Sequence, residues 1–273
     1  MTTTAQALGD TSTYAKSENQ KGDEVSSFFS ARGAVIGVAS VLALAVLARW
    51  YQGWASWDYG TESTSPEFSF YWMNLFYAQL ILAATAFVAG IAYMWFTRDK
   101  DLTKITSKVE LRRYSTFISM LVVYAFAFVF AGSFFAEQDA AWHQVVMRDT
   151  SFTPSHIVLF YGFFPLFIIL GFTTYTYAMT RLPLYAKGVS IPLVLGTLGP
   201  MMVLPNVGYN EWGHAFWFME EYFTAPLHWG FVVFGWSIMG LGGILVQLMS
   251  RISILMSDVF LPSPEPKTTA YTS

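Results

Sequence analysis

The chain has 273 residues, of which 54% are hydrophobic, 18% aromatic and only 12% charged, and its formal net charge is −3. Soluble domains carry roughly 25% charged residues, so this composition indicates an integral membrane protein, and the charge balance does not suggest nucleic-acid binding. The absence of cysteine from the sequence excludes disulfides, iron–sulfur clusters and thiolate zinc sites.

Six apolar segments predict an all-α, polytopic bundle of transmembrane helices. Most approach or exceed the roughly 20 residues needed to cross the hydrocarbon core of a bilayer. The expected spans are residues 31–50, 70–96, 115–135, 155–179, 189–204 and 226–249. The fifth contains Pro192 and Pro200 together with glycines. We therefore expect a kinked, broken or re-entrant helical segment before the last span, with its freed carbonyls bonded by neighbours.

Polar segments at both ends frame a single membrane domain. Residues 1–28 are rich in Thr, Ser, Lys and Glu, and we expect a disordered or interfacial arm and not a cleavable signal. The transmembrane domain is expected over residues 29–251. Residues 252–273, which end in LPSPEPKTTAYTS, are expected to form a disordered tail.

Lys and Arg are distributed unevenly among the connections. Of the 15, all except Arg49 and Arg148 fall in the arm, in the tail, or between spans 2 and 3 and spans 4 and 5. The positive-inside rule therefore predicts that both termini are cytoplasmic. The other three connections then face the extracytoplasmic side.

All four histidines belong to two polar clusters at this extracytoplasmic end. In the first cluster Asp139 and His143 are four residues apart, which places them on one face if the segment is helical. His156 follows Pro154 at the start of the fourth span and can fold back to complete the set. Two imidazoles and a carboxylate form a three-ligand site that suits zinc, copper or non-haem iron. The alternative is a capping or interfacial pair in water.

The second cluster consists of Asn210, His214 and His228. Asn210 and His214 are again four residues apart, and His228 lies just inside the last span. An amide oxygen is a weak, neutral ligand, so this site would carry less charge, and acidic residues nearby could support it. The alternative is a hydrogen-bonded polar plug beneath a re-entrant loop.

Two other functional classes fit parts of this pattern. A haem-bearing membrane anchor would use two histidines on neighbouring spans, but haem does not need the oxygen ligands beside them. A proton-coupled transporter would place Asp and His near the midplane of the membrane, whereas these residues lie towards one end.

The chain resembles the C subunit of the copper membrane monooxygenases, which include particulate methane monooxygenase, ammonia monooxygenase and short-chain hydrocarbon monooxygenases. Two long segments carry the resemblance, FFAEQDAAWHQVVMRDTSFTPSH and LPNVGYNEWGHAFWFMEEYFTAPLHWGFVVFGW. The likeness covers about residues 50–251 and includes SPEFSFYWMN, WFTRDKD, TRLPLYAKG and GPMMVLPN.

The resemblance implies two copper sites, one Asp-His-His and one Asn-His-His. Their ligands fall on Asp139, His143 and His156 and on Asn210, His214 and His228. It also implies assembly with an A and a B subunit, as a trimer of such protomers, with O2 as oxidant and quinol as electron donor. The first site would then hydroxylate a small substrate. The alternative is a structural subunit whose catalytic copper lies in a partner.

One position bears on the substrate. Methane-type members have Glu where this chain has Leu159. SFTPSHIVLFYGFFP is closer to ammonia-type sequences, whereas FYWMN and YAKGVS are closer to hydrocarbon-type ones, so ammonia, a short-chain alkane and methane all stay open. The aromatic residues expected to exclude water from the first site are Trp142, Phe134, Phe135 and Phe160.

Overall fold

The computed structural model describes residues 30–136, 138–139, 153–202 and 220–261, without the side chains of residues 132, 133 and 220–234. All regular elements in these ranges are helices. Five are long and apolar enough to cross a membrane, over Arg32–Tyr59, Pro66–Phe96, Ser107–Phe130, Pro154–Arg181 and Gly235–Phe260. The prediction of an all-α, polytopic bundle is confirmed.

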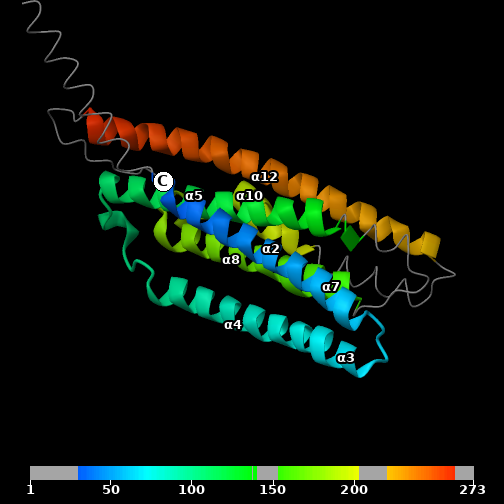
Figure 1. Ribbon diagram of the computed structural model, residues 1–273. Coiled ribbons are helices and arrows are strands. Elements are labelled where there is room, and N and C mark those ends of the chain that lie inside the picture. Colours follow the sequence, from blue (N-terminus) through cyan, green and yellow to red (C-terminus); the bar gives the residue numbers. More distant parts are fainter. Residues whose placement is uncertain (1–29, 137, 140–152, 203–219, 262–273) are drawn as a thin grey trace, which may run out of the picture.

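The long helices lie side by side in the bundle (Figure 1). In the centre are α2 (Arg32–Tyr59), α5 (Ser107–Phe130) and α8 (Phe164–Arg181). α4 (Asn74–Phe96) packs on α8 at one side, and α12 (Glu220–Phe260) packs on α5 and α10 (Ile191–Leu198) at the other. The short helices are α3 (Pro66–Phe68), α7 (Pro154–Val158) and α9 (Pro183–Ala186).

Side-chain caps explain where several helices begin. The hydroxyls of Ser65, Thr106 and Ser190 each accept a hydrogen bond from the backbone N–H three residues further on. Such bonds satisfy amide groups that the first turn of a helix leaves without partners. Pro66 and Pro154 occupy the first helical position, where the missing N–H costs nothing.

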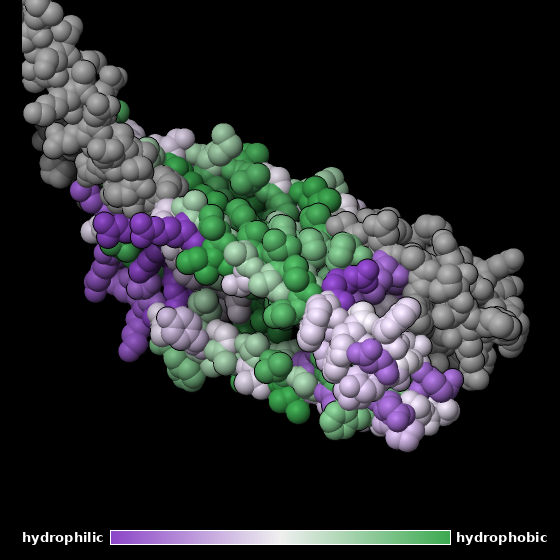
Figure 2. All heavy atoms as spheres, in the orientation of Figure 1, coloured by the Kyte–Doolittle hydropathy of each residue, from purple (hydrophilic) through white to green (hydrophobic). Residues whose placement is uncertain are grey.

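Polar and apolar side chains are separated along the bundle. Hydrophobic side chains dominate its middle, and hydrophilic ones gather towards its ends (Figure 2). Exposed large hydrophobic residues include Ile81, Leu82 and Val88 on α4. A helix that exposes such side chains is stable in lipid, which agrees with a multi-pass membrane protein.

The last helix is longer than the sequence suggested. α12 continues to Phe260, so residues 252–260, which were expected to belong to the disordered tail, are helical. Arg251 does not end the helix, because its Nε and Nη2 lie 2.8 and 2.7 Å from the two carboxylate oxygens of Glu110 on α5. Leu255, one turn beyond, is 1% exposed and belongs to the core between these helices.

The fifth predicted span is a short helix in the described part of the chain. α10 is followed by a 3-10 turn over Gly199–Met202, and the described segment ends there. The expected break is present as this change from α-helical to 3-10 geometry at Gly199, next to Pro200. The Tyr124 hydroxyl on α5 donates to the carbonyl of Gly196 at 2.7 Å, as expected for a freed carbonyl bonded by a neighbour.

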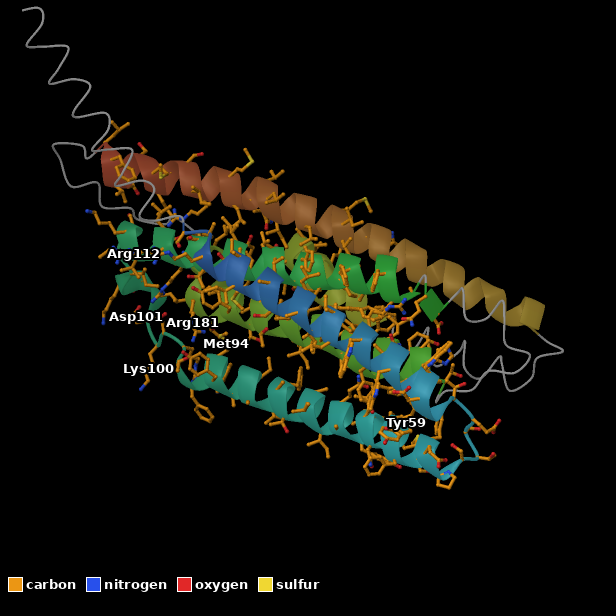
Figure 3. The ribbon with its side chains drawn as sticks, in the orientation of Figure 1. Tyr59, Met94, Lys100, Asp101, Arg112 and Arg181 are labelled. Carbon is orange, nitrogen blue, oxygen red and sulfur yellow. The ribbon has the colours of Figure 1, made fainter. Side chains whose placement is uncertain are left out.

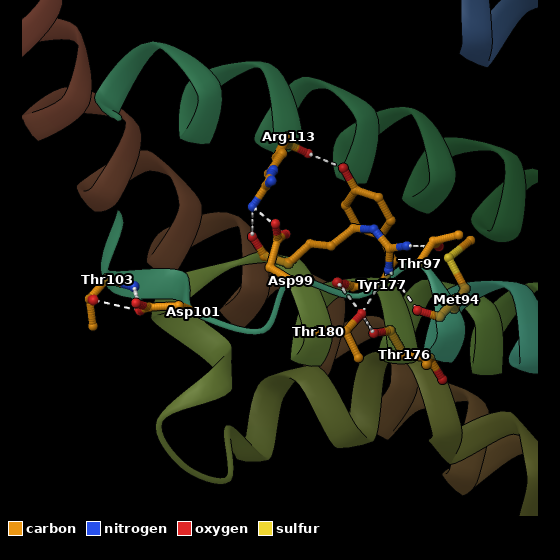
Figure 4. A network of polar contacts seen from close by, with 10 residues as sticks. Met94, Thr97, Asp99, Asp101, Thr103, Arg113, Thr176, Tyr177 and Thr180 are labelled. Atoms are coloured by element: carbon orange, nitrogen blue, oxygen red, sulfur yellow. Dashed lines mark hydrogen bonds and ion pairs between the residues drawn. The ribbon is translucent and has the colours of Figure 1, made fainter. Parts of the chain in front are cut away.

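Arginines join three helix ends near the α4–α5 connection (Figure 4). Arg113 on α5 lies 2.8 Å from the carboxylate of Asp99 and donates to the carbonyl of Arg181 at 3.0 Å. Arg181, the last residue of α8, donates to the carbonyl of Met94 at 3.2 Å and to the hydroxyl of Thr97. The ends of α4, α5 and α8 are thereby held together.

Candidate functional site

The first polar cluster lies at the end of the bundle opposite the α4–α5 connection, beside α7 (Figure 1). α7 starts the fourth span and carries His156 in its first turns. Asp139 has helical backbone conformation and lies beyond the end of α5. The chain between them, residues 140–152, includes His143 and lies outside the described residues.

Asp139 and His156 meet in the interior of the protein. Nε2 of His156 lies 3.1 Å from Oδ1 of Asp139. His156 is 0% exposed and Asp139 is 9% exposed. The hydroxyl of Ser155 donates to the same Oδ1 at 2.7 Å. Burial of a carboxylate is costly unless it is paired and hydrogen-bonded, and this one has both kinds of partner.

Two π-helical turns flank these residues in the chain. Ala131–Phe135 precedes Asp139, and Leu159–Phe163 follows His156. The turns contact one another through the stacked rings of Phe135 and Phe163, whose centroids are 4.1 Å apart. Turns of this type are rare and occur often at functional sites, because they change which side chains a helix presents. Sequence reasoning did not predict them.

An aromatic side chain covers one face of the imidazole. The ring of Phe160 stacks on that of His156 at a centroid distance of 4.5 Å. Phe135 is 1% exposed and lies in the same core as Leu159 and Phe163. These contacts agree with the expectation that Phe135 and Phe160 exclude water.

Phe134 has a different position from the one expected. It is 41% exposed, and its ring lies 5.4 Å from the guanidinium carbon of Arg49 on α2. Consecutive residues of a helix point in directions about 100° apart, so burial of Phe135 turns Phe134 outward. The expectation that Phe134 shields the site is therefore wrong. Trp142 lies outside the described residues.

Gln52 is a further polar residue near this cluster, and no sequence pattern singled it out. It lies on α2, is 4% exposed, and its Nε2 is 3.5 Å from the carbonyl oxygen of Pro154. Within the described part of the chain, its buried Oε1 has no hydrogen-bond partner. The amide thus reaches the first turn of α7, two residues before His156, across 102 residues of sequence.

The donor set at Asp139 and His156 fits a transition metal. Imidazole nitrogen and carboxylate oxygen bind such ions at about 2.0–2.2 Å, so two ligands of one ion are roughly 2.8–3.4 Å apart. The observed 3.1 Å suits this arrangement and also lies within ion-pair distance. The described residues contain no group of three His, Cys, Asp or Glu that could hold a metal, since the third expected ligand, His143, is outside them.

The second cluster lies largely beyond the described residues. Asn210 and His214 are both outside them. His228 is part of α12, but its side chain is not described. A site formed by these three residues stays a prediction.

Comparison with known families gives one match over most of the chain. The family model for the C subunit of ammonia monooxygenase/methane monooxygenase matches residues 15–259. This range includes both histidine clusters and every helix named above except the last residue of α12. No curated protein matches the chain.

Proposed function

The chain belongs to the family of ammonia monooxygenase/methane monooxygenase C subunits, and from this membership we propose that it provides copper ligands to a membrane-bound monooxygenase. As a member it is one component of a larger complex with several different subunits. We further propose that its partners are an A and a B subunit, in a trimer of such protomers. The buried contact between His156 and Asp139 is the observation that carries the proposal.

The first copper site consists of Asp139, His143 and His156. Two of these side chains already converge at 3.1 Å inside the protein. Three protein ligands would hold the ion and leave room for O2, as at other catalytic metal sites. Asp139 contributes negative charge that offsets the charge of the ion in surroundings where water is scarce.

Bound there, copper would supply the reduction of O2, by which one oxygen atom enters the substrate and the other leaves as water with two electrons and two protons from a quinol. The residues of this chain hold and shield the centre. The Phe160 ring covers one face of His156, and the Ser155 hydroxyl orients the carboxylate. Exclusion of water around a reactive metal prevents side reactions.

The substrate is a small neutral molecule: ammonia, methane or another short-chain alkane. Leu159, the position that is Glu in methane-type members, is 1% exposed and packs in the core with Phe163. It makes the core one turn from His156 apolar where methane-type members carry a carboxyl group, and apolar surroundings favour a small molecule without charge.

A second copper site is proposed at Asn210, His214 and His228. The first site lies at the end of the bundle away from the Lys- and Arg-rich α4–α5 connection, and α12, which carries His228, begins at the same end (Figure 1). From the positive-inside rule we propose that this connection and both termini are cytoplasmic and that both sites face the extracytoplasmic side.

Metal analysis and copper EPR of the purified complex test the proposal. Asp139→Asn and Asn210→Asp each change one ligand of one site, so each should alter the copper content or the EPR spectrum of its own site alone. Activity that survives complete loss of copper from the first site would assign the oxidation to a partner and leave this chain a structural role.

A further inference from the structure

The connection between α4 and α5 contains two carboxylates that are already engaged. Asp99 lies 2.8 Å from Nη1 of Arg113, and Asp101 lies 3.1 Å from Nζ of Lys104. Asp101 also accepts hydrogen bonds from the backbone N–H and the hydroxyl of Thr103. Neither acid is available to neutralise a further cation nearby.

Two exposed cations of the same connection have no such partner. Arg98 and Lys100 form no ion pair with an acid among the described residues, and both are exposed. Figure 3 shows Lys100 at the end of the bundle, beside Asp101 and beyond the last turn of α4. Positive charge therefore stays uncompensated at this edge.

Arg98 is held in a defined position. Its Nη1 donates to the carbonyl of Trp95 at 2.7 Å, and its guanidinium carbon lies 4.1 Å from the centre of the Trp95 ring. A guanidinium has five N–H donors, so this arrangement leaves donors for an anion. An arginine already ordered in this way loses less entropy when it binds a phosphate.

The charged edge continues into exposed apolar surface. Tyr93, Trp95 and Phe96, in the last turn of α4, are 65%, 53% and 82% exposed. Trp and Tyr at a helix end are typical of the headgroup level of a bilayer. Exposed cations and an exposed apolar surface thus adjoin one another.

We propose that Arg98, Lys100 and the exposed aromatic residues at the end of α4 form a binding site for one anionic phospholipid. The lipid phosphate contacts Arg98 and Lys100, and its acyl chains lie along Trp95 and Phe96. Basic segments next to a membrane helix attract anionic lipids through such charges. We assign a lipid and not soluble phosphate, because soluble phosphate would use only the cations and leave the aromatic surface without a function.

The test uses the purified complex in nanodiscs of equal parts dioleoylphosphatidylglycerol and dioleoylphosphatidylcholine. Native mass spectrometry then counts the lipids that stay bound. Removal of one cation should weaken phosphatidylglycerol binding about fivefold, and the double variant Arg98→Gln/Lys100→Gln about thirtyfold. Phosphatidylcholine binding should not change.

Lys104→Gln provides the matched control, since it removes one cation from the same connection but one that already pairs with Asp101. Arg98→Lys keeps the charge and loses the planar contact with Trp95, so it should weaken binding less than Arg98→Gln. If the double variant fails to assemble, Arg98→Lys still tests the contribution of the guanidinium group.

Three results would overturn the proposal. They are unchanged phosphatidylglycerol binding in Arg98→Gln/Lys100→Gln, an equal loss in Lys104→Gln, and release of the lipid by 10-fold excess inorganic phosphate. The second would indicate a general charge effect, and the third a site for the free anion.

Discussion

The hydroxyl of Tyr124 on α5 donates a hydrogen bond to the backbone carbonyl of Gly196 on α10, at 2.7 Å. Four residues after Gly196 stands Pro200, which has no N–H to offer that carbonyl. The tyrosine hydroxyl thus donates the hydrogen bond that the proline cannot donate, in a region where water is scarce. The pair joins two helices at the point where the shorter one ends.

Tyr124→Phe should therefore destabilise the complex, because it leaves a buried carbonyl without a donor. The expected cost is about 1–3 kcal/mol. Thermal unfolding of the purified complex measures it. Tyr77→Phe, which removes a hydroxyl from a residue that is 54% exposed, should have little effect. In the Tyr124→Phe background, Pro200→Ala restores a backbone N–H and should recover part of the loss; a further loss would contradict this account.

Glu110 and Arg251 form a bidentate ion pair that joins α5 to α12, and Glu110 is 3% exposed. Removal of Glu110 as Glu110→Gln should cost about 3 kcal/mol, because Arg251 would keep its charge without a counter-charge. This corresponds to a fall of roughly 6–12 °C in the thermal midpoint.

Glu110→Leu/Arg251→Met should be closer to the wild type than either single variant, since no charge stays buried alone. Asp99→Asn, at a more exposed pair with Arg113, is the comparison and should cost about 1 kcal/mol or less. Equal losses at both pairs would argue that burial does not determine the effect.

His156→Ala should lower the copper content of the complex and abolish turnover, because it removes a ligand buried beside Asp139. Copper is measured by elemental analysis and turnover by substrate oxidation. His156→Gln, which retains a polar side chain in the same space, separates loss of the ligand from collapse of the site. Full copper and full activity in His156→Ala would remove this site from the mechanism.

Ser155 acts as a positioning residue for Asp139, through the 2.7 Å bond to Oδ1. Ser155→Ala should weaken copper binding about 10-fold, the lower end of the 10- to 100-fold range roughly expected for a lost hydrogen bond behind a ligand. Ser155→Thr keeps the hydroxyl and should restore the affinity. Chelator competition gives the affinity, and the copper EPR spectrum reports the geometry. If Ser155→Ala and Ser155→Thr bind copper with the same affinity and give the same EPR spectrum, the hydroxyl has no positioning role.

Asp101 should make the turn at residues 102–104 sensitive to acid. Hydrogen bonds from the Thr103 hydroxyl and from Lys104 lower the pKa of this carboxyl below its ordinary value of 3.8. A lowered pKa means that the carboxylate stabilises the folded turn above pH 3.8, and that this stabilisation is lost as the pH falls through the lower, folded value. Hydrogen exchange at the Thr103 amide should accelerate there, and Asp101→Asn should abolish that pH dependence.

Much of this protein follows from its sequence. Apolar length and scarce charge predicted the helices, because a bilayer admits only segments that satisfy their own backbone groups. Pro200 predicted the break in the fifth segment, and the spacing of Asp139, His143 and His156 selected the polar cluster. These are local properties, so they can be read along the chain.

Other features depended on contacts between distant segments. The packing of α2 against α7 brings Gln52 to Pro154. Arg251, where the membrane domain was expected to end, pairs with Glu110 on α5, and α12 continues beyond it. Phe134 points outward because its neighbour Phe135 is buried in the core. Residue order specifies which helices form. The tertiary structure decided which side chains meet, because ion pairs, hydrogen bonds and burial arise only between surfaces that the fold brings into contact.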